Sequence, residues 1–194
     1  MTGKPTALDV AQYVYNRLGW VDAWRLEKLT YFSQVWHLAW DGRPIFDDQF
    51  EAWPDGPVVR DLHRVNKYDR QGGVWGTALP GADPARLSDT ARASIDRVLD
   101  FYGKLPKSEL IALTHEDAPW RVARGGLADD SYSSEALSVT EMRRCYTAKV
   151  IAGKEDIPTA PPTSAVGVSG PGYAAAVARQ TSRWAGALDL LADR

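Results

Sequence analysis

Hydrophobic positions between residues 23 and 41 predict a helix that is buried on most sides. Apolar and aromatic side chains recur there every three or four residues and form two adjacent stripes on the helix surface. A helix that is apolar around most of its circumference packs inside a domain. Asp22 is suited to cap its start and Gly42 to end it, so we expect a central helix between them. The stripes contain Leu26, Leu29, Phe32, Trp36 and Ala39, and Lys28, Tyr31, Val35 and Leu38.

Start and stop signals predict further helices on both sides of this stretch. Residues 6–9 (TALD) and the pair Ser138 and Glu141 have the spacing of capping boxes. Gly or Pro follows most of the other runs that have helical periodicity. The predicted helices run from Thr6 to Gly19, from Pro57 to about Tyr68, from Ser88 to Gly103, from Ser108 to Pro119, and from Ser138 to about Gly153.

A small β element is predicted after the central helix. Residues 46–53 alternate imperfectly between apolar and polar positions before a Pro-Asp-Gly-Pro turn, which predicts a short strand or an extended loop. Residues 70–87 contain repeated Gly and Pro, and they form either the second strand of a small hairpin or a loop. The expected fold class is therefore mostly α, a compact multi-helix domain with a small β-hairpin or extended element.

The composition of the chain changes sharply near residue 153. Residues 1–152 make up the predicted helical domain, and residues 153–172 are rich in Pro and Gly, as flexible linkers are. Residues 173–194 then predict an amphipathic C-terminal helix that includes Trp184. Such a helix docks on its own domain, docks on a partner, or stays disordered until it binds.

Charge and cysteine content limit the classes of function. The net charge of −2 gives no general attraction to nucleic acid or to an anionic membrane, so neither is expected as a partner. A single cysteine, Cys145, builds neither a disulfide framework nor a cysteine-based zinc site, which favours a reducing, cytoplasmic location. We recognise no signal peptide and no run of membrane-spanning length.

Candidate chemical groups are few. His37 falls on the central helix, where a core histidine is expected, and His115 stands in a polar helix end just before Trp120. Nucleotide-binding, serine-hydrolase and metalloprotease motifs are not recognisable. We therefore expect a protein that is not an enzyme and that needs no cofactor or metal. The acidic residues Asp47, Asp48, Glu51 and Asp55 are expected to be solvated rather than to form a cation site.

Four segments, in order, resemble the Panacea domain, the SocA-like antitoxin family. They are LEKLTYFSQVWHL at residues 26–38, GRPIF at 42–46, FEAW with GPVV at 50–59, and LIALTHEDAPW at 110–120. The chain departs from the family pattern at Glu27, where Gln is usual, and at Pro54 and Asp55. Most motif residues, such as Trp36 and Trp120, are expected in the core.

The resemblance implies an antitoxin that neutralises a neighbouring-gene toxin by direct protein–protein binding. Aromatic and arginine residues are the usual anchors of such interfaces. The residues we expect to bind the partner are Trp53, Asp55, Arg60, His115 and Trp184.

Two alternatives remain open at this point. One is a proteolytic adaptor that delivers a toxin to a protease, because one family member has that role. The other is a DNA-binding autorepressor, for which a modest basic stripe is the only supporting feature. That stripe contains Arg60, Arg64, Lys67 and Arg70.

Overall fold

The central element of the fold is α2 (Ala23–Asp41), as predicted. The computed structural model describes residues 3–128, 130–153 and 156–162. Every residue from Leu26 to Leu38 is buried, because other elements cover α2 on all sides. The side chain of Asp22 caps the helix by accepting a hydrogen bond from the backbone N–H of Arg25, and Gly42 ends it in the left-handed conformation.

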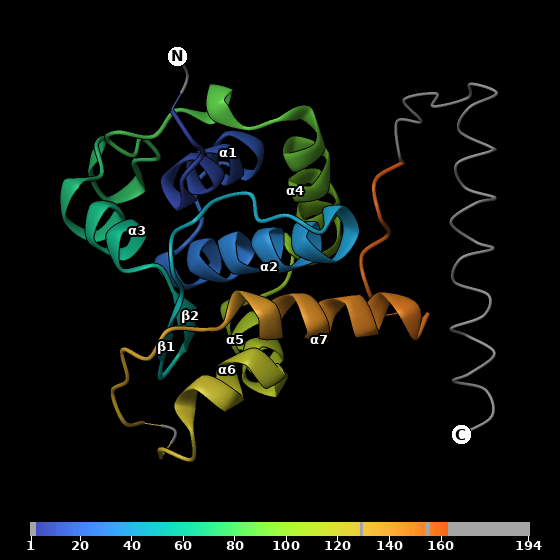
Figure 1. The fold of residues 1–194 in the computed structure, drawn as a ribbon. Helices are drawn as coiled ribbons and strands as arrows, with labels where there is room; N and C mark the ends of the chain where they lie inside the picture. The colour runs from blue at the N-terminus through green and yellow to red at the C-terminus, as the bar shows by residue number, and fades with distance from the viewer. Residues whose placement is uncertain (1–2, 129, 154–155, 163–194) are drawn as a thin grey trace, which may run out of the picture. The chain divides into compact units, whose positions relative to one another are not determined.

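The other helices pack around α2 (Figure 1). Helices α1 (Ala7–Leu18) and α4 (Asp89–Tyr102) lie on one side of it, and α5 (Lys107–Glu116) and α7 (Val139–Ile151) lie on the other. Helix α6 (Ala118–Arg124) packs against α5 and α7. The predicted helices that begin at Thr6, Ser88 and Ser138 are confirmed, because local caps determine these boundaries.

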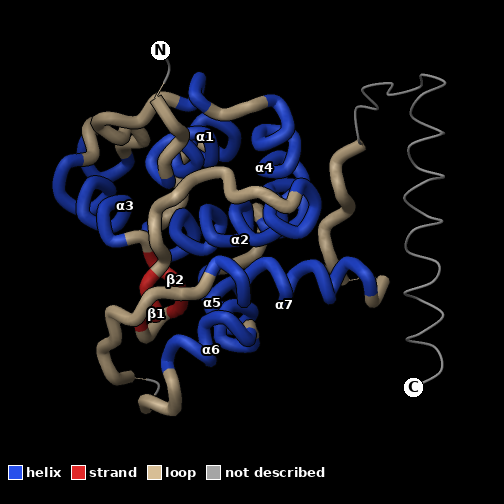
Figure 2. The backbone as a smooth tube through the Cα atoms, in the orientation of Figure 1, coloured by secondary structure: helices blue, strands red, loops and turns tan. Residues whose placement is uncertain are grey.

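The hairpin consists of β1 (Glu51–Trp53) and β2 (Gly56–Val58), which pair antiparallel (Figure 2). The prediction that Pro57 begins a helix was wrong. Pro57 lies in β2 opposite Ala52, and in this two-stranded sheet its missing N–H can face away from the partner strand. The following helix, α3 (Arg60–Arg64), starts three residues later.

The end of this helix and the loop after it agree with the predictions. Helix α3 continues into a π-helical turn, η1 (Val65–Asp69), which ends close to the predicted Tyr68. Residues 70–87 form a loop with two short 3₁₀ turns, which is the loop alternative of the two that were predicted. These turns are η2 (Gly73–Trp75) and η3 (Pro84–Arg86). Pro119 does not simply end α5 but lies in the first turn of α6, where proline is well accommodated.

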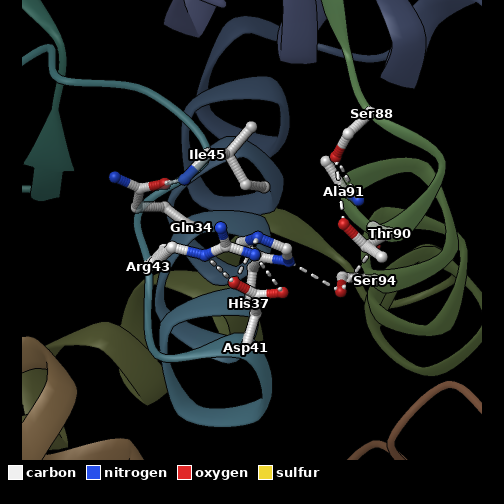
Figure 3. A network of polar contacts seen from close by, with 9 residues as sticks. All are labelled: Gln34, His37, Asp41, Arg43, Ile45, Ser88, Thr90, Ala91 and Ser94. Atoms are coloured by element: carbon white, nitrogen blue, oxygen red, sulfur yellow. Dashed lines mark hydrogen bonds and ion pairs between the residues drawn. The ribbon is translucent and has the colours of Figure 1, made fainter. Parts of the chain in front are cut away.

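Polar side chains on α2 satisfy neighbouring backbone and side-chain groups (Figure 3). The amide of Gln34 accepts a hydrogen bond from the backbone N–H of Ile45 and donates one to the carbonyl of Phe46, each at 2.8 Å. His37 is a buried core histidine, as expected, and its Nδ1 lies 2.9 Å from Oγ of Ser94 on α4. These bonds fix the loop after α2 and the position of α4.

The predicted C-terminal helix, with Trp184, lies outside the described residues, as does most of the predicted linker. None of the helices in the described ranges is long and apolar enough to cross a membrane.

Candidate functional site

A pocket of about 500 Å³ opens where the start of α2 meets the hairpin. Its walls come from four segments: the turn before α2 with the first turns of that helix, the hairpin, the α3–η1 helix, and the loop that contains Val74. The lining residues are Trp20, Asp22, Ala23, Trp24, Glu27, Lys28, Trp53, Pro54, Asp55, Val58, His63, Asn66, Lys67, Arg70 and Val74.

Tryptophans form much of the pocket wall. The indole N–H of Trp24 donates a hydrogen bond of 3.1 Å to Asp55 Oδ2, which joins α2 to the hairpin turn. The ring of Trp53 packs against the imidazole of His63, with ring centroids 4.9 Å apart. Trp24 is 44% exposed, so the wall stays accessible from solvent.

An exposed aromatic pair extends the wall outwards. The rings of Trp20 and Trp75 meet edge to face with centroids 4.5 Å apart. Trp20 is 38% exposed, Trp75 is 69% exposed and Val74 beside them is also exposed. We call Trp20, Trp24, Trp53, Val74 and Trp75 the aromatic rim.

The floor of the pocket contains two buried ionisable side chains. Nζ of Lys28 donates to the carbonyl of Pro57 at 3.0 Å, and Oε2 of Glu27 accepts a 3.4 Å bond from the backbone N–H of Val59. Burial raises the pKa of Glu27 and lowers the pKa of Lys28, because each charged form loses hydration, and the attraction between the two opposes both shifts. Shifted pKa values in a cleft are typical of functional sites, although these two groups also hold the hairpin.

One acceptor in the floor is unsatisfied. Glu27 is 3% exposed, and its Oε1 has no hydrogen-bond partner among the described residues. The other carboxylates of the lining are engaged, since Asp22 caps α2 and Asp55 accepts from Trp24. A buried acceptor without a donor carries a desolvation cost that a bound donor would remove.

The family-like motifs meet behind the hairpin and support it. The indole N–H of Trp120 donates to the carbonyl of Trp53 at 3.0 Å, and Nη1 of Arg124 donates to that of Ala52 at 3.1 Å. Gly56 has a φ of +100°, and a Cβ there would lie 2.5 Å from Oγ1 of Thr114. Only glycine allows this approach of the hairpin to α5.

The structure separates the residues that were predicted to bind a partner. Trp53 and Asp55 line the pocket. Arg60 lies outside it and forms two 2.8 Å bonds to the carboxylate of Glu51. His115 is half-buried and stacks on Trp120, with centroids 4.2 Å apart. Trp184 is outside the described residues.

Several residues in and beside the pocket were missing from the predicted set. Trp20 and Trp24 flank the cap of α2, and Trp75 stands in a Gly-rich loop, where a large apolar side chain has few core neighbours. The adjacent charges of Glu27 and Lys28 inside a hydrophobic run were a second signal. Charged residues are seldom fully buried unless they are bonded, so this pair indicated a special environment.

A second polar centre lies at the junction of α2, α6 and α7. The buried carboxylate of Asp117 accepts from Nζ of Lys149 at 2.6 Å and from the hydroxyls of Tyr31 and Tyr146. Burial raises the pKa of Asp117, and the nearby Lys149 opposes that shift. All three donors come from distant positions in the chain, so the centre locks the helices together.

Neither the acidic cluster nor the basic stripe forms a shared site. Asp47 pairs with Lys4 at 3.0 Å, and Asp48 accepts from the backbone N–H of Ala7 at 3.0 Å. Among the described residues, no group of three His, Cys, Asp or Glu side chains could hold a metal ion. In the basic stripe, Arg64 pairs with Asp69 at 2.6 Å and Arg70 donates to the carbonyl of Val74 at 2.9 Å.

Part of this fold matches a known protein family. Residues 26–121, from the second turn of α2 to α6, match the family model described as antitoxin SocA-like, Panacea domain. Antitoxin SocA of Caulobacter vibrioides (strain NA1000 / CB15N) is 33% identical over 111 residues, which cover 52% of this chain and 58% of that protein. The chain thus spans little more than half the length of this relative. No solved structure matches.

Proposed function

This chain belongs to the SocA-like Panacea family through residues 26–121, and on that premise we propose that it is an antitoxin that binds a toxin encoded beside it. Neutralisation follows from direct protein–protein binding. Such a role uses shape, apolar area and hydrogen bonding, and it requires no catalytic group. A stable complex of this kind buries roughly 1,200–2,000 Å².

The aromatic rim is the observation that supports a binding surface at the pocket. Trp20, Trp24 and Trp75 expose large apolar surfaces around a hollow, and together with Val74 they form a patch rather than isolated residues. Contiguous exposed apolar surface indicates an interaction site. Tryptophan is also the residue most enriched among the side chains that dominate binding energy. The toxin is therefore proposed to dock over the pocket.

Co-expression tests the proposal. Cells carry the adjacent open reading frame with the wild-type chain or with a variant, and growth and co-purification are measured in the same cultures. Trp20→Ala removes a rim residue that is 38% exposed, and Phe101→Ala removes an aromatic residue of matched exposure, 40%, on α4 away from the pocket. We expect Trp20→Ala to weaken the complex by about tenfold or more, and Phe101→Ala to leave it unchanged.

The outcomes separate the alternatives. If Trp20→Ala still rescues growth and co-purifies with the toxin while Phe101→Ala does neither, the binding surface is not at the aromatic rim. A harmless neighbour would contradict the antitoxin role for that gene pair. Rescue with a shortened toxin half-life would indicate a proteolytic adaptor, and salt-dependent binding to the chain's own promoter would indicate an autorepressor.

A further inference from the structure

We propose that the pocket binds one basic side chain, an arginine or a lysine, presented by the protein partner. The occupant places its charged head at Glu27 on the floor and its aliphatic stem between the tryptophans of the wall. The preference of the pocket for a basic group is inferred from the contacts of Glu27 and of the other lining residues. The identity of the partner as a toxin rests on the proposed function.

One acceptor in the floor has no hydrogen-bond donor. Oε1 of Glu27 is buried and has no partner within the described part of the chain, whereas Oε2 accepts the N–H of Val59. A ligand that fills this position must carry an N–H or O–H group. Arginine and lysine heads carry donors only, and they add charge that stabilises the carboxylate.

The cations of the lining do not occupy this acceptor. Lys28 donates to the carbonyl of Pro57, and Arg70 donates to Tyr15 and to the carbonyl of Val74. Nζ of Lys67 lies 5.1 Å from the ring centroid of Tyr68. Burial and then the neighbouring lysines lower the pKa of His63, which disfavours its charged form.

The wall suits a cation with an apolar stem. Trp20, Trp24 and Trp53 line the pocket, and among aromatic rings a cation is attracted most strongly to the face of tryptophan. Trp24 already has a cation over its ring, since Nζ of Lys107 lies 4.6 Å from the centroid. Lysine and arginine stems pack along apolar surface while their heads reach polar groups.

The test uses small probes and no toxin, so it is independent of the proposed function. The full ¹⁵N-labelled chain is titrated with N-acetyl-arginine amide, N-acetyl-lysine amide, the neutral N-acetyl-citrulline amide and the apolar N-acetyl-norleucine amide. The readout is the indole N–H signals of Trp20, Trp24 and Trp53, assigned with single Trp→Phe variants. We expect a cationic probe to shift these signals and to bind about tenfold more tightly than citrulline.

Two variants locate the contact. Glu27→Gln keeps the size of the side chain and replaces the carboxyl group by an amide that cannot ionise, and we expect it to weaken the cationic probe by about tenfold. Glu109→Gln, an exposed position on α5, is the matched control and should change nothing. Trp24→Leu removes part of the wall at an exposed position, with an expected loss of roughly threefold.

Each outcome of the titrations supports or contradicts binding of a basic side chain in the pocket. Tighter binding of norleucine or citrulline than of the cationic probes would overturn the inference, as would equal binding by Glu27→Gln and the wild type. If Glu27→Gln does not fold, the comparison of arginine with citrulline on the wild type still decides. If the cationic probes bind but the chain does not neutralise the toxin, only the proposed function is contradicted. If the chain neutralises the toxin but the probes do not bind, only this inference is contradicted.

Discussion

Nζ of Lys28 donates a hydrogen bond of 3.0 Å to the carbonyl oxygen of Pro57, and this bond fastens the central helix to the hairpin. Both groups are buried, and the bond forms part of the floor of the tryptophan-lined pocket. The same contact thus supports the fold and shapes the candidate site. Substitutions around it separate the two roles.

Replacing Lys28 by methionine keeps the stem and removes the donor. We expect the free energy of unfolding to fall by about 1–3 kcal/mol, because the buried carbonyl of Pro57 loses its partner and Glu27 loses the neighbouring charge. Urea denaturation followed by circular dichroism measures the change. Lys104→Met, at an exposed position, is the control and should stay within about 0.5 kcal/mol of the wild type. Equal stability of the two variants would contradict this role of Lys28.

Gly56→Ala tests the close approach between the hairpin and α5. The new Cβ would lie 2.5 Å from Oγ1 of Thr114 and 2.9 Å from Cε of Lys28, at a φ of +100°. We expect a loss of about 2–5 kcal/mol from backbone strain and overpacking together. Gly42→Ala is the matched control, because its φ of +83° is also positive but its Cβ would meet open space. It should show only the backbone cost, about 1 kcal/mol. The idea fails if both variants lose the same stability in thermal or urea unfolding.

His37 makes stability depend on pH. Burial lowers its pKa in the folded state below the ordinary 6.5, with Asp41 opposing the shift and Arg43 reinforcing it. The unfolded chain therefore takes up a proton near pH 6.5 that the folded chain resists, so the stabilisation is complete above that pH and is lost as the pH falls below it.

His37→Asn retains a group that can bond Ser94 and removes the titration. The difference in the free energy of unfolding between the wild type and this variant should shrink as the pH is lowered from 7.5 to 5.5. Other titrating groups are common to both proteins and cancel. Parallel stability curves over this range would show that His37 does not titrate differently in the two states.

Asp117 is the acceptor for Tyr31, Tyr146 and Lys149. Asp117→Ala leaves buried donors without a partner, and we expect a loss of about 3–5 kcal/mol. Asp117→Asn keeps an acceptor oxygen for the tyrosines and should lose only about 1–2 kcal/mol. Denaturation of both variants under identical conditions measures the gap. Similar losses would mean that the charge, and not the hydrogen bonds, is what the helices require.

Local signals in the sequence determined most helices and the family. Helix α2 was predicted from Asp22 to Gly42 because its cap, its stop and its apolar periodicity all lie within the helix or next to it. The buried positions of Trp36 and Trp120 were also predictable, and so was the membership of the SocA-like Panacea family. The four sequence motifs and their order along the chain indicated both. These features depend on residues that are close in the chain.

Only the tertiary structure decided the second strand of the hairpin and the pocket. Pro57 has the sequence signature of a helix start, but Trp120 and Arg124 hold the hairpin from about 70 residues away, |i−j| being 67 and 72 for their bonds. Glu27 and Lys28 are charged residues in an otherwise apolar run. Only the fold brings residues 57 and 59 close enough to be their hydrogen-bond partners. The exposure of Trp20 and Trp75 likewise depends on what distant segments leave uncovered. Sequence periodicity reports which side chains share a face, and only packing determines which face remains open.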